Sequence, residues 1–87
     1  MLYTVYVLYS KKYDKIYIGY TCNLIKRFHS HNKLGVKGYT VRYRPWEVVY
    51  TETFNSKNKA MKREKELKSS RGRAFIREQF VGLISVN

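Results

Sequence analysis

The stretch Ile16-Tyr17-Ile18-Gly19-Tyr20-Thr21 predicts a short strand and the turn into the helix after it. Four of its first five residues are β-branched or aromatic, which is a composition typical of a strand. The alternation of side chains places Tyr17 and Gly19 on one face. Gly19 has two explanations at this point. It marks a bulge or a strand end, or its missing side chain lets a phosphate or another side chain approach the sheet closely.

The helix that follows is predicted over residues 23–31. Thr21 and Asn23 are both residue types that cap the N-terminus of a helix, because a short polar side chain accepts a hydrogen bond from a free backbone N–H. Helical spacing places Arg27 and His31 four residues apart, and therefore on one face. A permanent cation and a titratable imidazole are thus predicted side by side.

The remaining elements follow from periodicity and from turn residues. Residues 2–10 alternate with apolar side chains on both faces, so we expect a strand that is covered on both sides. We also predict a loop over 33–45, a strand over 46–53, a helix over 57–69, an interruption at 70–73 and a last helix over about 73–84. The expected fold is α/β: a small three-stranded antiparallel sheet flanked by helices in the order β-β-α-β-α-α, forming one domain over residues 1–87.

The charge of the chain indicates a polyanionic partner. Eighteen Lys and Arg residues against six Asp and Glu give a net charge of +12 in 87 residues. Such a charge destabilises a compact state by self-repulsion, so a partner that neutralises it is the simplest explanation. We expect nucleic acid, and we rank an anionic membrane surface last because no strongly amphipathic basic helix with bulky apolar anchors is present. One cysteine and the lack of a signal or spanning pattern favour a cytoplasmic protein.

The predicted loop over residues 33–45 interleaves basic and aromatic side chains. Cations suit phosphates and rings suit exposed bases, so this pattern is expected in a nucleic-acid groove. We expect the binding residues of this loop and of the neighbouring helices to be Lys26, Lys37, Tyr39, Arg42, Arg44, Lys65 and Lys68.

One acidic residue lies where the helix over 57–69 should be apolar. Ala60, Glu64 and Leu67 are spaced i, i+4 and i+7, so Glu64 is in the middle of the only apolar stripe of this helix. A carboxylate on a core-facing stripe is rarely buried without a partner. The partner is either a cation in a structural ion pair, for which Lys68 at i+4 is available, or a metal ion.

These residues together carry a family resemblance. The chain resembles a GIY-YIG nuclease domain, and specifically the small stand-alone members of that family. Tyr17-Ile18-Gly19 matches the second motif intact, and Thr4-Val5-Tyr6 matches the first motif at its tyrosine. Arg27 matches the arginine of the family's helix, and Glu64 matches its metal-binding glutamate.

The resemblance implies a metal-dependent endonuclease acting on DNA, with Tyr6, Tyr17, Arg27, His31 and Glu64 in the site. Glu64 would be the ligand for Mg²⁺ or Mn²⁺, because magnesium suits a site with a single carboxylate. Arg27 would stabilise charge on the phosphate. The proton acceptor is either Tyr6 or His31. Branched or damaged DNA in repair or recombination is the expected substrate, with no small-molecule cofactor and no membrane partner.

Two other functions are compatible with the same residues. The first is a nucleic-acid-binding module of this fold with weak or lost catalysis. The second is an RNA- or ribosome-associated basic protein, which would prefer RNA and ignore magnesium. Only the nuclease requires Glu64 for cleavage.

Overall fold

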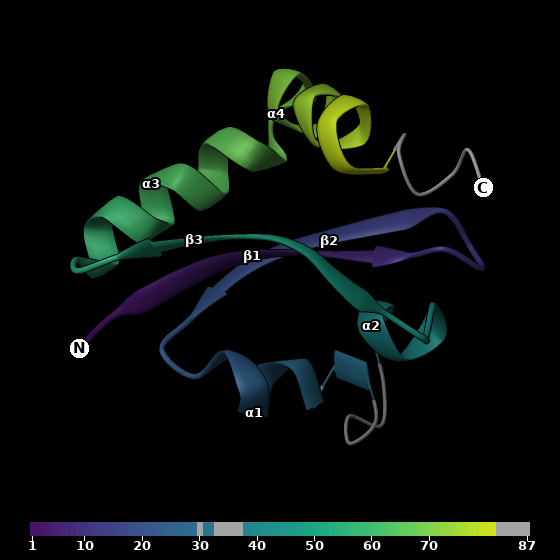
Figure 1. Ribbon diagram of the computed structural model, residues 1–87, viewed down its shortest axis with the longest axis horizontal. Coiled ribbons are helices and arrows are strands. Elements are labelled where there is room, and N and C mark those ends of the chain that lie inside the picture. The colour runs from purple at the N-terminus through teal and green to yellow at the C-terminus, as the bar shows by residue number, and fades with distance from the viewer. Residues whose placement is uncertain (30, 33–37, 82–87) are drawn as a thin grey trace.

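The computed structural model describes residues 1–29, 31–32 and 38–81. Its three strands are β1 (Tyr3–Ser10), β2 (Lys15–Thr21) and β3 (Glu47–Phe54), which form one antiparallel sheet in the order β2-β1-β3. The described helices are α1 (Leu24–His29), α2 (Tyr39–Arg42), α3 (Lys57–Lys68) and α4 (Ser70–Ile76), and α4 continues into a π-helical turn, η2 (Arg77–Val81). The predicted α/β architecture is confirmed, with β1 as the central strand (Figure 1).

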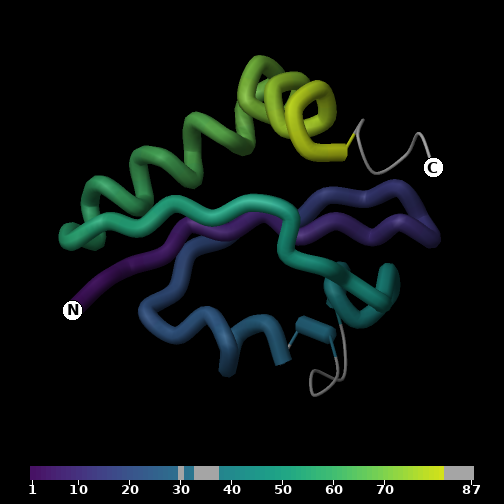
Figure 2. Tube along the Cα trace, viewed as in Figure 1, coloured from purple at the N-terminus to yellow at the C-terminus, as the bar shows by residue number. Residues whose placement is uncertain are grey.

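The sheet is covered on both faces. Helices α3 and α4 lie over one face, and α1 and α2 lie over the other, as the chain trace in Figure 2 also shows. On the α3 face, Val5, Val7 and Tyr9 pack into a core with Ala60 and Leu67. The intervening residues of β1 point the other way and build a second core, whose buried members are Tyr6, Leu8 and Trp46. The prediction that β1 is buried on both faces is therefore confirmed.

Two predicted boundaries are wrong. The segment expected as a loop over residues 33–45 contains the short helix α2, and residues 33–37 lie outside the described part of the chain. The last helix begins at Ser70 and not near residue 73, because Ser69 caps it: Ser69 Oγ accepts a hydrogen bond from the N–H of Gly72 at 3.1 Å. Gly72, which suggested an interruption, lies inside α4. A Cβ there would collide with the backbone of Glu66 and Leu67 at the end of α3.

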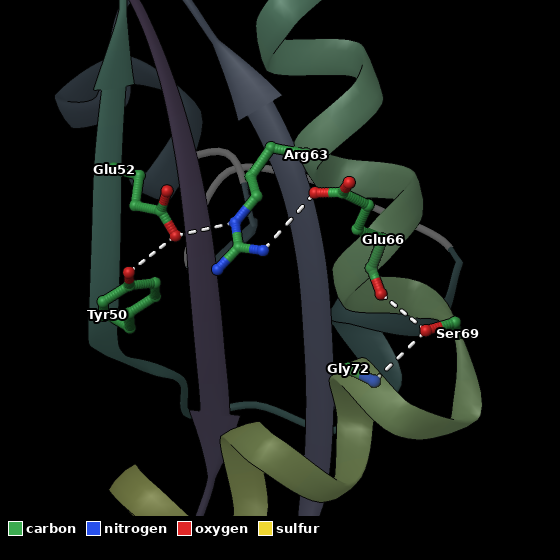
Figure 3. A network of polar contacts seen from close by, with 6 residues as sticks. All are labelled: Tyr50, Glu52, Arg63, Glu66, Ser69 and Gly72. Atoms are coloured by element: carbon green, nitrogen blue, oxygen red, sulfur yellow. Dashed lines mark hydrogen bonds and ion pairs between the residues drawn. The ribbon is translucent and has the colours of Figure 1, made fainter.

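A polar network fastens α3 to the edge strand β3 (Figure 3). Glu52 Oε2 accepts from Tyr50 Oη at 2.6 Å and from Arg63 Nε at 2.9 Å, while Arg63 also pairs with Glu66 at 3.4 Å. Beside this pair, Ser69 Oγ donates to the Glu66 carbonyl at 2.6 Å. The network holds the orientation of α3 on the sheet, and so it determines where Glu64 on the same helix is presented.

The hairpin between β1 and β2 is fastened to η2. Asp14 Oδ1 accepts hydrogen bonds from Tyr9 Oη and from Arg77 Nη1, each at 2.9 Å. Arg77 Nη2 also donates to the Asp14 carbonyl at 3.1 Å. The C-terminal helical region therefore stays against the β1–β2 hairpin. In the described ranges, no helix has the length and apolarity needed to cross a membrane.

Candidate active site

The first feature of the site is the close approach of Tyr6 to Gly19. These residues are opposite each other in the β1–β2 register. Tyr6 is only 1% exposed, and a Cβ built on Gly19 would lie 2.6 Å from Tyr6 Oη and 2.8 Å from Tyr6 Cζ. The Tyr6 ring therefore lies across Gly19. Of the two explanations for this glycine, the structure supports the close approach of a side chain.

Tyr6 forms a buried hydrogen bond with His31. Tyr6 Oη lies 2.9 Å from His31 Nε2, and His31 is 6% exposed. Burial lowers the pKa of His31 to about 4, with the positive charges of Arg27 and Arg44 adding to the effect. Burial also raises the pKa of Tyr6 to about 12. Both groups are therefore uncharged near pH 7, and the imidazole tautomer decides which of them donates.

Arg27 brings a permanent positive charge to this pair. It lies on α1, whose first turn is capped by Asn23: Asn23 Oδ1 accepts from the N–H of Lys26 at 3.1 Å. Thr21 Oγ1 accepts in turn from the N–H of Asn23, which sets the angle between β2 and the helix. Hydrogen bonding to Tyr6 is the largest cause that raises the pKa of Arg27. The charge of Arg27 in turn lowers the pKa of the Tyr6 hydroxyl, so the two groups interact electrostatically.

The Tyr17 ring packs near the rings of Tyr6 and His31. Its ring centroid lies 4.6 Å from that of His31 and 6.3 Å from that of Tyr6. Unlike Tyr6, the Tyr17 side chain is only partly buried, so it is accessible to a substrate. The two motif tyrosines therefore differ: Tyr6 is buried and hydrogen-bonded to His31, whereas Tyr17 is partly exposed and lines a groove described below.

Glu64 comes from the helical layer on the other face of the sheet. It lies on α3 between the buried residues Ala60 and Leu67, and its side chain is 21% exposed. Lys68 Nζ lies 3.6 Å from its carboxylate, so the ion pair considered above does form. The negative charge of Glu64 is also the smallest of the causes that act on the pKa of Tyr6, which it raises.

A groove at the free edge of β2 connects these layers. It has a volume of about 450 Å³ and is lined by Ile16, Tyr17, Ile18, Tyr39, Lys68 and Arg73. Tyr17 belongs to the α1 face, whereas Lys68 and Arg73 come from α3 and α4. The groove therefore straddles the sheet edge, and it exposes Tyr17 beside the cation that pairs with Glu64.

The donor set at Glu64 is compatible with a hard divalent cation. Among the described residues there is no cluster of three His, Cys, Asp or Glu side chains that could enclose a metal. A single carboxylate suits Mg²⁺ or Mn²⁺, because such an ion keeps several waters and takes oxygens from the substrate. Glu64 is partly exposed and, within the described ranges, is held only by one ion pair longer than a hydrogen bond. The residues present therefore fit such an ion.

The predicted nucleic-acid contacts divide into two groups. Lys26, Arg42, Lys65 and Lys68 are exposed, and Tyr39 is 45% exposed, while Lys37 lies outside the described residues. Arg44 is different, because it is partly buried and its Nε donates to the carbonyl of His31 at 2.8 Å. This contact makes Arg44 a support for His31.

Sequence reasoning missed Trp46, which forms two hydrogen bonds that shape the site. The N–H of Trp46 donates to Asn32 Oδ1 at 2.7 Å, and its indole Nε1 donates to the carbonyl of Thr40 at 2.7 Å. Trp46 thus connects the start of β3 to the segment after α1 and to α2. It is the only tryptophan in the chain, but no spacing in the sequence predicted these bonds.

The fold and the motif residues define the class of protein: the chain belongs to the family of GIY-YIG catalytic domains, a nuclease family, whose model matches residues 2–77. Similar proteins include a UPF0213 protein of Staphylococcus haemolyticus, 39% identical over 92% of this chain and 90% of that one. A UPF0213 protein of Natronomonas pharaonis is 45% identical over 75% of each chain. The solution NMR structure of a UPF0213 protein from Bacillus halodurans matches with a TM-score of 0.54 and 30% identity, over 87% of this chain and 82% of that one.

Proposed function

We propose that this protein is a divalent-metal-dependent endonuclease that hydrolyses phosphodiester bonds in DNA, with branched or damaged DNA as the substrate in repair or recombination. The observation that carries the proposal is the buried Tyr6–His31 hydrogen bond, with the charges of Arg27 and Glu64 both acting on the pKa of the Tyr6 phenol. A structural core would not need an imidazole hydrogen-bonded to its phenol, because burying polar groups away from water has a cost.

His31 is the better candidate for the final proton acceptor. A phenol whose pKa is raised to about 12 is almost never ionised at pH 7, so Tyr6 alone is a poor base. His31 is neutral at pH 7 and its Nε2 touches the Tyr6 oxygen. In this proposal the attacking water gives its proton to Tyr6 Oη while the Tyr6 proton moves to His31 Nε2. A bound phosphate would offset the charge of Arg27, which is one cause of the low pKa of His31.

Arg27 and Glu64 have the complementary roles. Arg27 remains charged at every relevant pH, and its guanidinium fork suits two phosphate oxygens, so it stabilises the negative charge that develops on phosphorus. Glu64 would hold Mg²⁺ or Mn²⁺, which when bound supplies a Lewis acid for the phosphate oxygens. Exposed cations and the net charge of +12 would hold the DNA backbone. Free, exposed Cys22 is consistent with the reducing cytoplasm in which we place the protein.

A second candidate function has its own supporting observation. Glu64 already has a cationic partner, Lys68 at 3.6 Å, as it would in a protein that needs no metal. The chain would then be a nucleic-acid-binding module of the same fold, with weak or no catalysis. Both candidates predict DNA binding that weakens steeply with salt. They differ in whether Glu64 is required for cleavage.

The deciding experiment measures cleavage of supercoiled plasmid and of labelled branched DNA in Mg²⁺, in Mn²⁺ and in EDTA. Wild type is compared with Glu64→Gln and Arg27→Ala, and Glu78→Gln, at an exposed carboxylate in η2, is the control. The nuclease predicts metal-dependent cleavage that both site variants abolish and the control retains, while Glu64→Gln still binds DNA. Salt-sensitive binding without cleavage, or cleavage that survives Glu64→Gln, would replace the nuclease by the binding module.

A further inference from the structure

A series of neighbouring aromatic rings begins at Tyr17 in the candidate active site. The ring centroids of Tyr17 and Tyr39 are 6.3 Å apart, those of Tyr39 and Tyr43 are 4.9 Å apart, and those of Tyr43 and Tyr13 are 5.5 Å apart. We call these four residues the tyrosine row. Trp46 packs against the row from the protein interior: it is 3% exposed, and its ring centroid lies 5.9 Å from that of Tyr39.

Two members of the row are exposed where a buried position would be expected. Tyr39 is 45% exposed and Tyr13 is 42% exposed, whereas Tyr6 and Tyr9 are at most 3% exposed. An apolar ring in water forgoes the free energy of burial, which is about 25 cal/mol for each Å² left exposed. Two such rings on a line that begins at the candidate active site therefore suggest a surface that a ligand covers.

Cations accompany the row along its length. Near its outer end, Lys12 Nζ lies 5.4 Å from the Tyr13 ring centroid, and Lys15 Nζ lies 5.2 Å from that of Tyr43. Near its inner end, Arg73 lines the 450 Å³ groove together with Tyr17 and Tyr39. A second groove of about 170 Å³ is also lined by Tyr39 and Arg73, and it extends the first towards the β1–β2 hairpin.

This combination fits unpaired nucleotides. Within a duplex both faces of each base are covered by its neighbours, so an exposed protein ring has nothing to stack on. In a single strand the bases stack on aromatic side chains, while cations beside the rings contact the phosphates between them. The tyrosine row provides rings, and Lys15 and Arg73, which line one groove together with Tyr39, provide cations beside them.

We propose that the tyrosine row, with Lys15 and Arg73, binds a single-stranded segment of the DNA substrate that is continuous with the strand cut at Tyr6 and Tyr17. The protein would therefore act on DNA in which unpaired nucleotides adjoin the scissile phosphate, as in a flap or a tail. This inference rests on the proposed function, since it names the substrate that the candidate active site would receive.

The test compares two fluorescein-labelled probes by fluorescence anisotropy in EDTA: a blunt duplex, and the same duplex with a tail of about six thymidines on one strand. Wild type should bind the tailed probe more tightly. Tyr39→Leu, which keeps an apolar side chain but removes the ring, should reduce the ratio of the two affinities about tenfold, while Tyr39→Phe should preserve it. The matched aromatic control is Phe75→Leu, because Phe75 is 39% exposed on α4 but lines a different groove.

The cations give a second, independent readout. Arg73→Gln should lower the salt dependence of tailed-probe binding by about one unit in the slope of log affinity against log salt, because one phosphate contact is lost. Arg71→Gln removes a charge from the same helix outside the row and should leave that slope unchanged.

The outcomes separate this inference from the proposed function. Equal affinity of wild type for both probes, or a ratio that Tyr39→Leu and Tyr13→Ala leave unchanged, would overturn the inference even if the protein cuts DNA. If the protein binds the tailed probe more tightly and this preference depends on Tyr39, the inference is supported even when the protein cuts no DNA. In that case the proposed nuclease activity is wrong and the proposed binding surface stands. Circular dichroism of each variant shows that the comparison is made on folded protein.

Discussion

Tyr6 Oη lies 2.9 Å from His31 Nε2, in a buried contact between residues 25 positions apart in the chain. Tyr6 comes from the central strand, whereas His31 follows α1. Burial moves the two pKa values in opposite directions, upwards for the phenol and downwards for the imidazole, so both groups stay neutral at pH 7. The contact is therefore a hydrogen bond between uncharged groups.

Removal of the Tyr6 hydroxyl tests this contact directly. We expect Tyr6→Phe to slow single-turnover DNA cleavage by at least about 100-fold, because a proton-transfer group is lost. The free energy of unfolding should fall by about 1–3 kcal/mol, because the buried His31 nitrogen loses its partner. Tyr9→Phe is the matched control: it removes a hydroxyl from the same strand, but one that donates to Asp14 on the hairpin. If that control slows cleavage equally, the assignment of Tyr6 is wrong.

The low pKa of His31 predicts how folding stability depends on pH. In the unfolded chain His31 would titrate near 6.5, whereas in the folded protein it titrates near 4. Between these values the unfolded state binds more protons, so the free energy of unfolding should fall as pH decreases from 7 to about 4. For His31 the loss by pH 5 is on the order of 1–2 kcal/mol.

The measurement is urea denaturation of wild type and of His31→Gln at several pH values. The variant should lose stability less steeply between pH 7 and 5, because glutamine does not titrate. Exposed His29→Gln, two positions earlier, serves as the control and should keep the wild-type slope. Parallel slopes for wild type and His31→Gln would show that His31 is not held neutral by the fold.

Gly19→Ala should damage both stability and activity. The added methyl would lie 2.6 Å from Tyr6 Oη and 2.8 Å from Tyr6 Cζ, and the Tyr6 ring is buried. We expect a loss of about 1–3 kcal/mol by overpacking and slower cleavage, because the Tyr6 hydroxyl is displaced from His31. Gly38→Ala is an informative comparison. Its φ of 105° disfavours a side chain, but no atom of the described residues lies within 4 Å of the added Cβ, so the backbone cost is the one we expect.

Two substitutions at Arg44 test whether this residue supports His31 or contacts DNA. Arg44→Lys keeps the charge but removes the Nε donor that holds the His31 carbonyl at 2.8 Å. We expect cleavage about tenfold slower, with an unchanged salt dependence of DNA binding, because the number of phosphate contacts stays the same. The expectation that Arg44 contacts phosphate predicts a different result for Arg44→Gln: a salt slope smaller by about one unit, with cleavage of bound DNA retained.

Local periodicity was sufficient to predict the main elements of this protein. The alternation in residues 2–10 predicted a strand buried on both faces, and the spacing of Ala60, Glu64 and Leu67 predicted a carboxylate on a core-facing stripe. Both predictions depend only on the periods of strands and helices, which are properties of neighbouring residues. The helix boundary at residue 73 failed because a glycine was taken as an interruption, whereas it permits close packing of α4 on the end of α3.

Only the tertiary structure decided which side chains meet. The sequence presented Tyr6, Gly19 and His31 as separate positions, and it left Gly19 with two explanations and the proton acceptor with two candidates. The strand register places Tyr6 opposite Gly19. Long-range hydrogen bonds from Arg44 to the His31 carbonyl and from Trp46 to Asn32 hold His31 where its ring meets the Tyr6 oxygen. The physical reason is that register, long-range hydrogen bonds and burial depend on contacts across the sheet. No local pattern contains them, and the pKa values that distinguish Tyr6 from His31 exist only once those contacts form.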